Sequence, residues 1–150
     1  MKIPSFSLPD QDNNTVTDKD LLGSWTVIYF YPKDDTPGCT AEACSFRDGR
    51  EVLESYGVRV IGISKDSVKK HKKFAEKYDL NFTLLSDEST ETIQAFGSWK
   101  LKKFMGREYM GINRDTYLIN PEGEIIKKYE GINPKTHIED IFKDFRLLSN

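Results

Sequence analysis

The sequence predicts an α/β fold in which helices cover a mixed central sheet on both faces. Two continuous apolar runs, at 25–31 and 58–64, are rich in β-branched and aromatic residues, and such runs are typical of strands buried on both faces. Each run precedes a segment with helical spacing of its apolar residues, and a hairpin pattern and a terminal helix follow later. Strands that alternate with helices favour a parallel sheet with right-handed crossovers, to which the later hairpin adds antiparallel strands.

Composition indicates one ordinary globular domain, residues 1–150. The chain is 37% hydrophobic and 31% charged, with a net charge of −2, which does not favour nucleic acid or a membrane surface as a partner. No apolar stretch approaches the ~20 residues needed to cross a bilayer, and residues 1–10 lack the apolar segment of a signal peptide. Two cysteines are too few for a disulfide-stapled secreted scaffold, so we expect a cytoplasmic protein.

The first elements are a small hairpin and a buried strand. Residues 3–17 alternate apolar and polar side chains around Asn13 and Asn14, a pattern typical of a hairpin turn. The strand over 25–31 then leads into a loop over 34–38 that is rich in Asp, Pro and Gly.

A helix over 37–56 follows this loop. Pro37 suits the first helical position and Thr36 the N-cap. Gly49 weakens the helix interior by ~1 kcal/mol relative to alanine. One apolar stripe faces the core: Ala43, Phe46 and Leu53.

The second half of the chain continues the alternation. After the strand over 58–64, we expect an amphipathic helix over 66–80, a strand over 82–87 and a short helix over 88–97. The apolar face of the first helix comprises Val68, His71, Phe74, Ala75 and Tyr78, and its lysine cluster forms the solvent face: Lys69, Lys70, Lys72 and Lys73.

The remaining residues complete the predicted sheet. Residues 98–113 are basic and are expected to be irregular, 116–131 read as two strands joined at an Asn-Pro-Glu-Gly turn, and 133–148 form a terminal helix. This order favours a thioredoxin-like fold with a mixed central sheet flanked by helices and an N-terminal hairpin.

Cys39 lies where a nucleophilic thiol is expected. It follows a strand and falls in the first turn of the predicted helix, where unpaired backbone N–H groups and the positive end of the helix dipole favour a thiolate. The loop before it is polar and contains glycine and proline rather than core residues, which disfavours an inert buried cysteine.

Cys44 cannot pair with Cys39 while the helix is intact. Five residues of α-helix separate their Cα atoms by a rise of about 7.5 Å and point their side chains about 140° apart, whereas a disulfide needs converging Cβ vectors. A disulfide between them is therefore conditional on unwinding, which Gly49 and the scarcity of apolar residues between the cysteines would make easy. A metal site is not expected, because His71 and His137 lie far away without ligand spacing.

The segment around the cysteines resembles the active-site signature of the peroxiredoxins. The pattern Pro-x-x-x-Thr/Ser-x-x-Cys is matched by Pro32, Thr36 and Cys39, and Cys44 is similar to the second cysteine of the Q-type, or bacterioferritin comigratory protein, subfamily. The opening IPSFSLPD and the later block 96–123, which contains Arg114, also resemble the family. The resemblance thus extends over nearly the whole chain.

The resemblance implies a thiol-dependent peroxidase that reduces hydrogen peroxide and organic hydroperoxides. Cys39 would be the peroxidatic thiolate and Cys44 the resolving thiol, joined as an intramolecular disulfide after local unwinding. A thioredoxin-type reductant would regenerate the thiols. No cofactor or metal is implied, and the absence of a further cysteine near the C-terminus suggests a monomer.

The remaining candidate residues take supporting roles in this resemblance. Thr36 would hydrogen-bond the thiolate and the peroxide, Arg114 would stabilise the thiolate, and Pro32 would shield it from water. The backbone N–H groups near Gly38 and Cys39 would bind the developing oxyanion.

Two interpretations of Glu42 remain open. It would assist proton transfer or hydrogen-bond Arg114, or it is a first-turn acid that the helix dipole favours. Trp99, Phe104 and Tyr109 are expected in the core or at the rim of the pocket. Tyr117 and Asn120 stand where the family often has Phe and Asp, and Asn13 and Asn14 replace a more usual glycine.

Two other functions remain open from the residues. A protein disulfide oxidoreductase would use the spacing Cys-x-x-Cys, whereas this chain has four residues between its cysteines. A redox-regulated chaperone or binding module would expose apolar surface when the Cys39 helix unwinds, and it would rely on the same disulfide.

Overall fold

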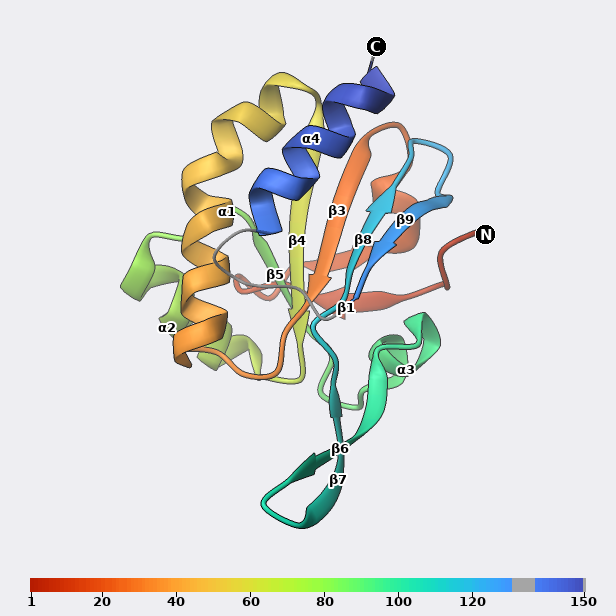
Figure 1. Cartoon of the computed structure of the whole chain (residues 1–150). Helices are drawn as coiled ribbons and strands as arrows, with labels where there is room; N and C mark the ends of the chain where they lie inside the picture. The colour runs from red at the N-terminus through yellow and green to blue at the C-terminus, as the bar shows by residue number, and fades with distance from the viewer. Residues whose placement is uncertain (131–136, 150) are drawn as a thin grey trace.

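The computed structural model of the chain describes residues 1–130 and 137–149. Its central sheet has five strands in the order β5-β4-β3-β8-β9 (Figure 1). The strands β3, β4 and β5 are parallel to one another. At one side of the sheet β8 pairs antiparallel with β3, and β9 pairs antiparallel with β8. The mixed sheet flanked by helices is therefore confirmed. The bounds of these strands are Trp25–Phe30 (β3), Val58–Ser64 (β4), Thr83–Ser86 (β5), Thr116–Ile119 (β8) and Ile125–Tyr129 (β9).

Two layers pack against the sheet. On one face a core cluster joins α1 (Pro37–Ser55), α2 (Val68–Tyr78) and α4 (His137–Ser149) to alternate residues of β3, such as Val27 and Tyr29. On the other face a second cluster joins the N-terminal hairpin and α3 (Glu91–Phe96) to Ile28 and Phe30. Because consecutive side chains of β3 enter different clusters, the strand is buried on both faces as its sequence predicts. None of the described helices is long and apolar enough to span a bilayer.

Most of the expected elements are confirmed with small changes of boundary. The N-terminal hairpin pairs β1 (Ser7–Pro9) with β2 (Thr15–Thr17), and a short 3-10 helix, η1 (Asp18–Leu21), follows it. Asn13 lies in its turn with a positive φ of 62°. The predicted stripe of α1 is fully buried, and the lysine cluster of α2 is exposed. The predicted start of the last helix lies in part outside the described residues, which resume at His137.

The segment 98–113 is a β-hairpin, so the expectation of irregular structure is wrong. Strand β6 (Trp99–Phe104) pairs antiparallel with β7 (Arg107–Ile112). Met105 and Gly106 form the turn, both with positive φ (51° and 80°), which is the backbone of a type I′ turn. The sequence obscured it because methionine, rather than asparagine or aspartate, precedes the glycine, and because lysines interrupt the apolar alternation.

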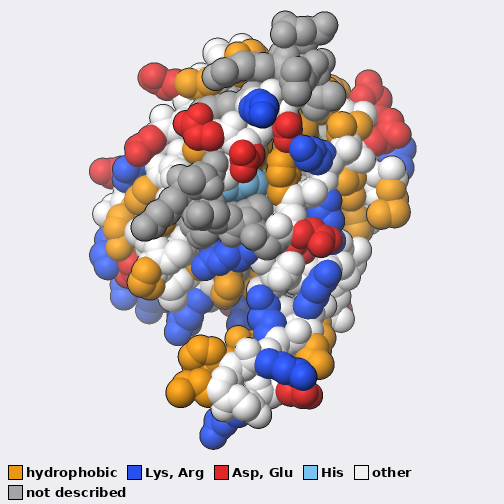
Figure 2. Space-filling view, in the orientation of Figure 1, with side chains coloured by type: hydrophobic (Ala, Val, Ile, Leu, Met, Phe, Trp, Pro, Cys, Tyr) orange, Lys and Arg blue, Asp and Glu red, His pale blue; other side chains and the backbone are white. Residues whose placement is uncertain are grey.

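This hairpin projects from the body of the protein (Figure 1) and carries apolar and basic side chains toward solvent (Figure 2). Phe104 and Tyr109 are 66% and 49% exposed, which excludes the core and leaves only the rim of the two places expected for them. Trp99, at the base of the hairpin, is half-buried against the second core cluster. The further exposed apolar residues of the hairpin are Leu101, Met105 and Met110.

Gly62 of β4 leaves room for the ring of Tyr29 of β3 on the face of the sheet that carries the cysteine helix. It pairs in register with Tyr29, and a Cβ at position 62 would lie 2.8 Å from Cζ of the Tyr29 ring. That ring is in turn stacked on Phe46 of α1, with centroids 4.7 Å apart. A glycine within a strand often marks such a close approach.

We expect Gly62→Ala to destabilise the protein by about 1–3 kcal/mol, because the added methyl forces the buried Tyr29 ring against Phe46. Urea unfolding of the wild type and the variant measures the change. The control is a double-mutant cycle with Tyr29→Leu, a shorter side chain that should remove most of the penalty. An equal penalty in both backgrounds would contradict the steric explanation.

Candidate active site

Cys39 lies in the first turn of α1 with its side chain buried. Its exposed fraction is 1%, and it belongs to the core cluster beneath the helices. The amide of Thr40 donates to the carbonyl of Thr36 (2.8 Å), so the amides of Gly38 and Cys39 precede the hydrogen-bonded turns of the helix. The predicted position at a helix N-terminus is thus present, although the thiol is more buried than the polar loop suggests.

Arg114 reaches Cys39 although 75 residues separate them in the chain. Its Nη2 donates a hydrogen bond to Sγ of Cys39 over 3.1 Å. The sheet explains the meeting, because β8 begins at Thr116 and pairs there with Tyr29, near the end of β3 that leads to the cysteine loop. A guanidinium keeps its positive charge at any working pH, so this contact places a permanent cation beside the sulfur.

Glu42 lies on the other side of the same guanidinium. Its Oε1 is 3.5 Å from Nη1 of Arg114, a long contact for a hydrogen bond, and its Oε2 has no hydrogen-bond partner among the described residues. Burial raises the pKa of the Glu42 carboxyl to about 8, against the opposing attraction of Arg114. At neutral pH the carboxyl is therefore mostly protonated and leaves the charge of Arg114 to the sulfur.

The other residues of the expected site surround this centre without contacting the sulfur in a hydrogen bond. Thr36 is the N-cap residue of α1, but its hydroxyl donates to the carbonyl of Lys33 (2.8 Å) rather than to the helix. Pro32 and Gly38 are half-buried in the same loop and first turn. The position of Thr36 is confirmed, whereas a side-chain cap is absent.

Cys44 is a free, half-buried thiol further along α1, and Cys39 is free as well. The helix runs without a break from Pro37 to Ser55, so the geometry that forbids a disulfide in an intact helix applies. Glu42 and Ala43 are both buried between the two cysteines. The expectation that little apolar surface opposes unwinding is therefore wrong: unwinding must expose part of the core.

Tyr29 brings a buried hydroxyl to this region that the sequence did not single out. The hydroxyl has no hydrogen-bond partner among the described residues. Burial raises the pKa of Tyr29 well above its usual value, and the nearby Glu42 and Cys39 add to the effect. The strand pattern identifies Tyr29 as buried, but only the pairing with Gly62 aims its ring under the cysteine helix.

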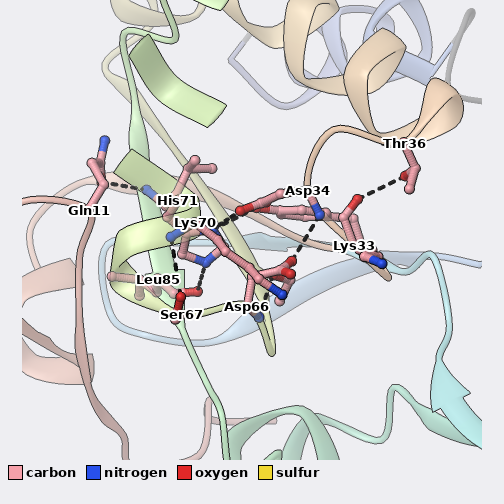
Figure 3. Close-up of polar contacts among 12 residues, drawn as sticks. Gln11, Lys33, Asp34, Thr36, Asp66, Ser67, Lys70, His71 and Leu85 are labelled. Carbon is pink, nitrogen blue, oxygen red and sulfur yellow. Dashed lines mark hydrogen bonds and ion pairs between the residues drawn. The ribbon is translucent and has the colours of Figure 1, made fainter. Parts of the chain in front are cut away.

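A second polar cluster lies beside the cysteine loop (Figure 3). Asp34, Asp66 and His71 place ligand-type atoms within 4.8 Å of one another. Their atoms are already engaged: Nδ1 of His71 lies 2.6 Å from Oδ2 of Asp34, and Oδ2 of Asp66 accepts from the amide of Asp34 (2.9 Å). Among the residues that the structure describes, this cluster is thus satisfied as a hydrogen-bond network rather than open as a metal site.

Comparisons with known proteins agree with this geometry. The model of the AhpC/TSA family matches residues 1–128. Peroxiredoxin Bcp of Bacillus subtilis is 45% identical over 148 residues, which cover 99% of this chain and 94% of that protein. Peroxiredoxin Bcp of Escherichia coli K12 is 47% identical over 134 residues, which cover 89% of this chain and 86% of that protein.

Solved structures show the same likeness. Peroxiredoxin Q of Xanthomonas campestris has a TM-score of 0.92 at 32% identity, over 97% of this chain and 92% of that one. Peroxidoxin BcpB of Mycobacterium tuberculosis has a TM-score of 0.86 at 30% identity, over 98% and 95% of the two chains. These neighbours confirm the expected thioredoxin-like fold.

Glu42 gives the site a testable pH dependence. Its pKa is raised from 4.5 to about 8 on folding, so the folded state holds this proton more tightly than the unfolded chain. The resulting stability is present below pH 4.5 and is lost as the pH rises toward 8, with each pKa unit worth about 1.4 kcal/mol.

We therefore expect the free energy of unfolding of the wild type to fall between pH 5 and 8 relative to that of Glu42→Gln, which cannot ionise. Urea titrations at several pH values measure the difference, in which the other titrating groups cancel. Glu51→Gln, on an exposed part of the same helix, is the control and should run parallel to the wild type. A parallel course for Glu42→Gln would contradict the raised pKa.

Proposed function

The chain belongs to the AhpC/TSA family as a peroxiredoxin of the Bcp and peroxiredoxin Q type, and we propose that it reduces peroxides with Cys39 as the attacking thiolate. The hydrogen bond from Arg114 Nη2 to Sγ of Cys39 (3.1 Å) is the observation that carries this proposal. It gives a buried sulfur a permanent cationic neighbour, which an inert core cysteine does not need.

In the first step the Cys39 thiolate attacks one oxygen of the peroxide. A sulfur–oxygen bond forms, the oxygen–oxygen bond breaks, and the departing oxygen leaves as water or an alcohol after taking up a proton. Cys39 becomes a sulfenic acid. Arg114 stabilises the charge that moves from sulfur to oxygen, and the amides of Gly38 and Cys39 are placed to donate to the reacting oxygens.

The supporting residues follow from the same arrangement. The hydroxyl proton of Thr36 is engaged with Lys33, so its free lone pairs would accept a hydrogen bond from the peroxide. Pro32 would exclude water from the loop side. Glu42, protonated at neutral pH because its pKa is about 8, is able to donate a proton to the departing oxygen.

In the second step Cys44 resolves the sulfenic acid. Its thiol sulfur bonds to Sγ of Cys39, water is released, and an intramolecular disulfide results. The first turns of α1 must unwind for this, since the intact helix holds the two side chains apart. A dithiol reductant of the thioredoxin type then reduces the disulfide by exchange and is itself oxidised.

The substrate class and the setting complete the proposal. A solved relative is titled for alkyl peroxide reduction by a bacterioferritin comigratory protein of Xanthomonas campestris, which supports organic hydroperoxides beside hydrogen peroxide as substrates here. We propose a monomer that acts in the cytoplasm as one domain over residues 1–150. The exposed apolar residues of the β6–β7 hairpin are where subunits would pair if the protein associates.

Substitution of each cysteine tests the mechanism. In an assay with thioredoxin, thioredoxin reductase and NADPH, we expect turnover by the wild type and none by Cys39→Ser, which lacks the nucleophile. Cys44→Ser should consume one equivalent of peroxide and then stop or run slowly on an added thiol. NADPH absorbance and direct peroxide determination provide the two measurements.

Two outcomes would contradict this proposal. Turnover by Cys39→Ser would remove Cys39 from the mechanism. Reduction of insulin disulfides by the wild type without peroxide turnover would favour the disulfide oxidoreductase instead.

Substitution of Arg114 tests the importance of its hydrogen bond to Sγ of Cys39. We expect Arg114→Gln to slow peroxide attack by about 10²–10³-fold, the usual effect of losing a donor that stabilises the transition state. Arg114→Lys should fall between the two, because it keeps the charge but loses the fixed fork of donors. Stopped-flow mixing with peroxide gives the rate constants. The control is Arg59→Gln, since Arg59 lies in β4, away from Cys39. If Arg114→Gln reacted with peroxide at the wild-type rate, the proposed role of Arg114 would be overturned.

A further inference from the structure

The loop between β3 and α1 is fixed at the residues directly before the cysteine helix. This loop, 31–36, supplies no hydrogen bond to Sγ of Cys39 among the described contacts, yet Thr36 accepts the first hydrogen bond of α1 from Thr40. Any movement of the loop therefore moves the turn that carries Cys39. The loop is held from below by a buried cluster and from outside by a surface pair, both of which involve α2.

The buried cluster centres on Asp34. Its Oδ1 accepts from the hydroxyl of Tyr31 (2.6 Å) and its Oδ2 lies 2.6 Å from Nδ1 of His71. The amide of Asp34 donates to Asp66 (2.9 Å), whose same oxygen accepts from the hydroxyl of Ser64 (2.7 Å). Figure 3 shows Asp34, Asp66 and His71 pointing toward one another. Both hydrogen-bonding functions of the Asp34 residue, side chain and backbone, are thus committed to holding the loop.

His71 connects this cluster to the rigid part of the fold. Its Nε2 lies 3.0 Å from the carbonyl of Leu85 in β5, and because a carbonyl only accepts, Nε2 carries a hydrogen. On the other side of the ring, Nδ1 lies 2.6 Å from Oδ2 of Asp34. His71 is fully buried, so its ring is a strut between the loop and the central sheet. Both ring nitrogens of His71 thus have hydrogen-bond partners within the protein.

The surface pair adds a second tether from the same helix. Asp35 has a positive φ of 59°, and its two carboxylate oxygens accept from Lys77 (2.7 Å) and from the hydroxyl of Tyr78 (2.7 Å). Both donors lie in the last turn of α2. Two consecutive loop residues are therefore bonded to α2 by side chains, one pair buried and one pair exposed.

We propose that a loop anchor sets how readily α1 unwinds after Cys39 is oxidised. This loop anchor consists of Tyr31, Asp34, Asp35, His71 and Lys77. The inference rests on the proposed function, in which Cys39 must leave its folded position to meet Cys44. With the anchor intact, the first turn of α1 stays folded and Cys39 remains beside Arg114. With the anchor weakened, the loop follows the unwinding turn at lower cost. These residues are positioning residues, since none is hydrogen-bonded to the sulfur.

The anchor then decides between two fates of the sulfenic acid. Unwinding leads to the disulfide with Cys44. A sulfenic acid that stays in the folded site instead meets a second peroxide, which oxidises it to the sulfinic acid and is itself reduced to water or alcohol. A tight anchor favours over-oxidation at high peroxide, and a loose anchor favours the disulfide.

Two variants weaken the anchor without removing a buried charge. Tyr31→Phe deletes only the hydroxyl that donates to Asp34, and Lys77→Ala removes an exposed partner of Asp35. We expect Tyr31→Phe to speed disulfide formation about fivefold, the rate factor for the loss of one buried hydrogen bond. Lys77→Ala should speed it less, because solvent screens the exposed ion pair with Asp35. The fraction of Cys39 converted to sulfinic acid at high peroxide should fall by a similar factor, while peroxide attack on the folded site stays equal or slows.

The measurement follows single oxidations by rapid quench with a thiol-blocking reagent and intact mass spectrometry, which separates thiol, disulfide and sulfinic forms. Tyr129→Phe is the matched control for Tyr31→Phe, because it removes a tyrosine–carboxylate hydrogen bond to Asp144 away from the loop. Lys69→Ala is the control for Lys77→Ala, as another exposed lysine of α2. Both controls should keep the wild-type ratio of disulfide to sulfinic acid, even where they lower overall stability.

Each outcome tests either the loop anchor or the proposed peroxidase function. A wild-type ratio in both anchor variants, or slower disulfide formation in them, would overturn the anchor. An equal change in the controls would reduce the anchor to a general effect of stability and overturn it as well. Failure of peroxide to oxidise Cys39 in the wild type would instead refute the proposed function.

Discussion

The proposed chemistry depends on keeping a negatively charged sulfur inside the folded protein. A buried anion is costly unless a charge and hydrogen bonds accompany it. Here the start of β8 pairs with the end of β3, and that antiparallel register brings Arg114 to within 3.1 Å of Cys39. The same edge of the sheet is where β3 delivers the chain to α1. The contact between Arg114 and Cys39 is thus a consequence of strand order: with β8 elsewhere in the sheet, Arg114 would not reach the sulfur.

The burial of Cys39 opposes the second step of the proposed cycle, in which α1 unwinds. Cys39, Glu42 and Ala43 are all packed within the first two turns of α1, so unwinding exposes apolar surface and a carboxyl that folding keeps dry. In the proposed cycle oxidation changes this balance, because an uncharged sulfenic acid would no longer need the charge of Arg114. What remains is packing and the attachment of the preceding loop to α2.

The sequence was sufficient for the parts that local patterns determine. The double-faced burial of β3, the bounds of α1 and the place of Cys39 at its start follow from apolar runs, proline and loop composition. Arg114 could be named only through the family resemblance, since nothing in its neighbourhood indicates a partner 75 residues away. The hairpin at 98–113 was missed because its turn lacks the usual asparagine or aspartate. The Asp34 cluster was missed because the loop between β3 and α1, β4, α2 and β5 each contribute one part, and a histidine on an amphipathic face looks like any core residue.

Glu42 shows why the local environment, rather than residue type, settles a role. The sequence left Glu42 open as a first-turn acid whose negative charge the helix dipole would favour, and this is wrong, because the first turn of α1 contains no acidic residue. The burial of Glu42 outweighs the attraction of Arg114, so the pKa rises to about 8 and the carboxyl is mostly neutral at pH 7. An ionised carboxylate would compete with the sulfur for the guanidinium and add repulsion to a thiolate. A neutral one removes that competition and provides a proton near the place where an alkoxide or hydroxide departs. The acid that looks like a rival of Cys39 in the sequence is, in the folded protein, compatible with a thiolate because the core keeps it uncharged.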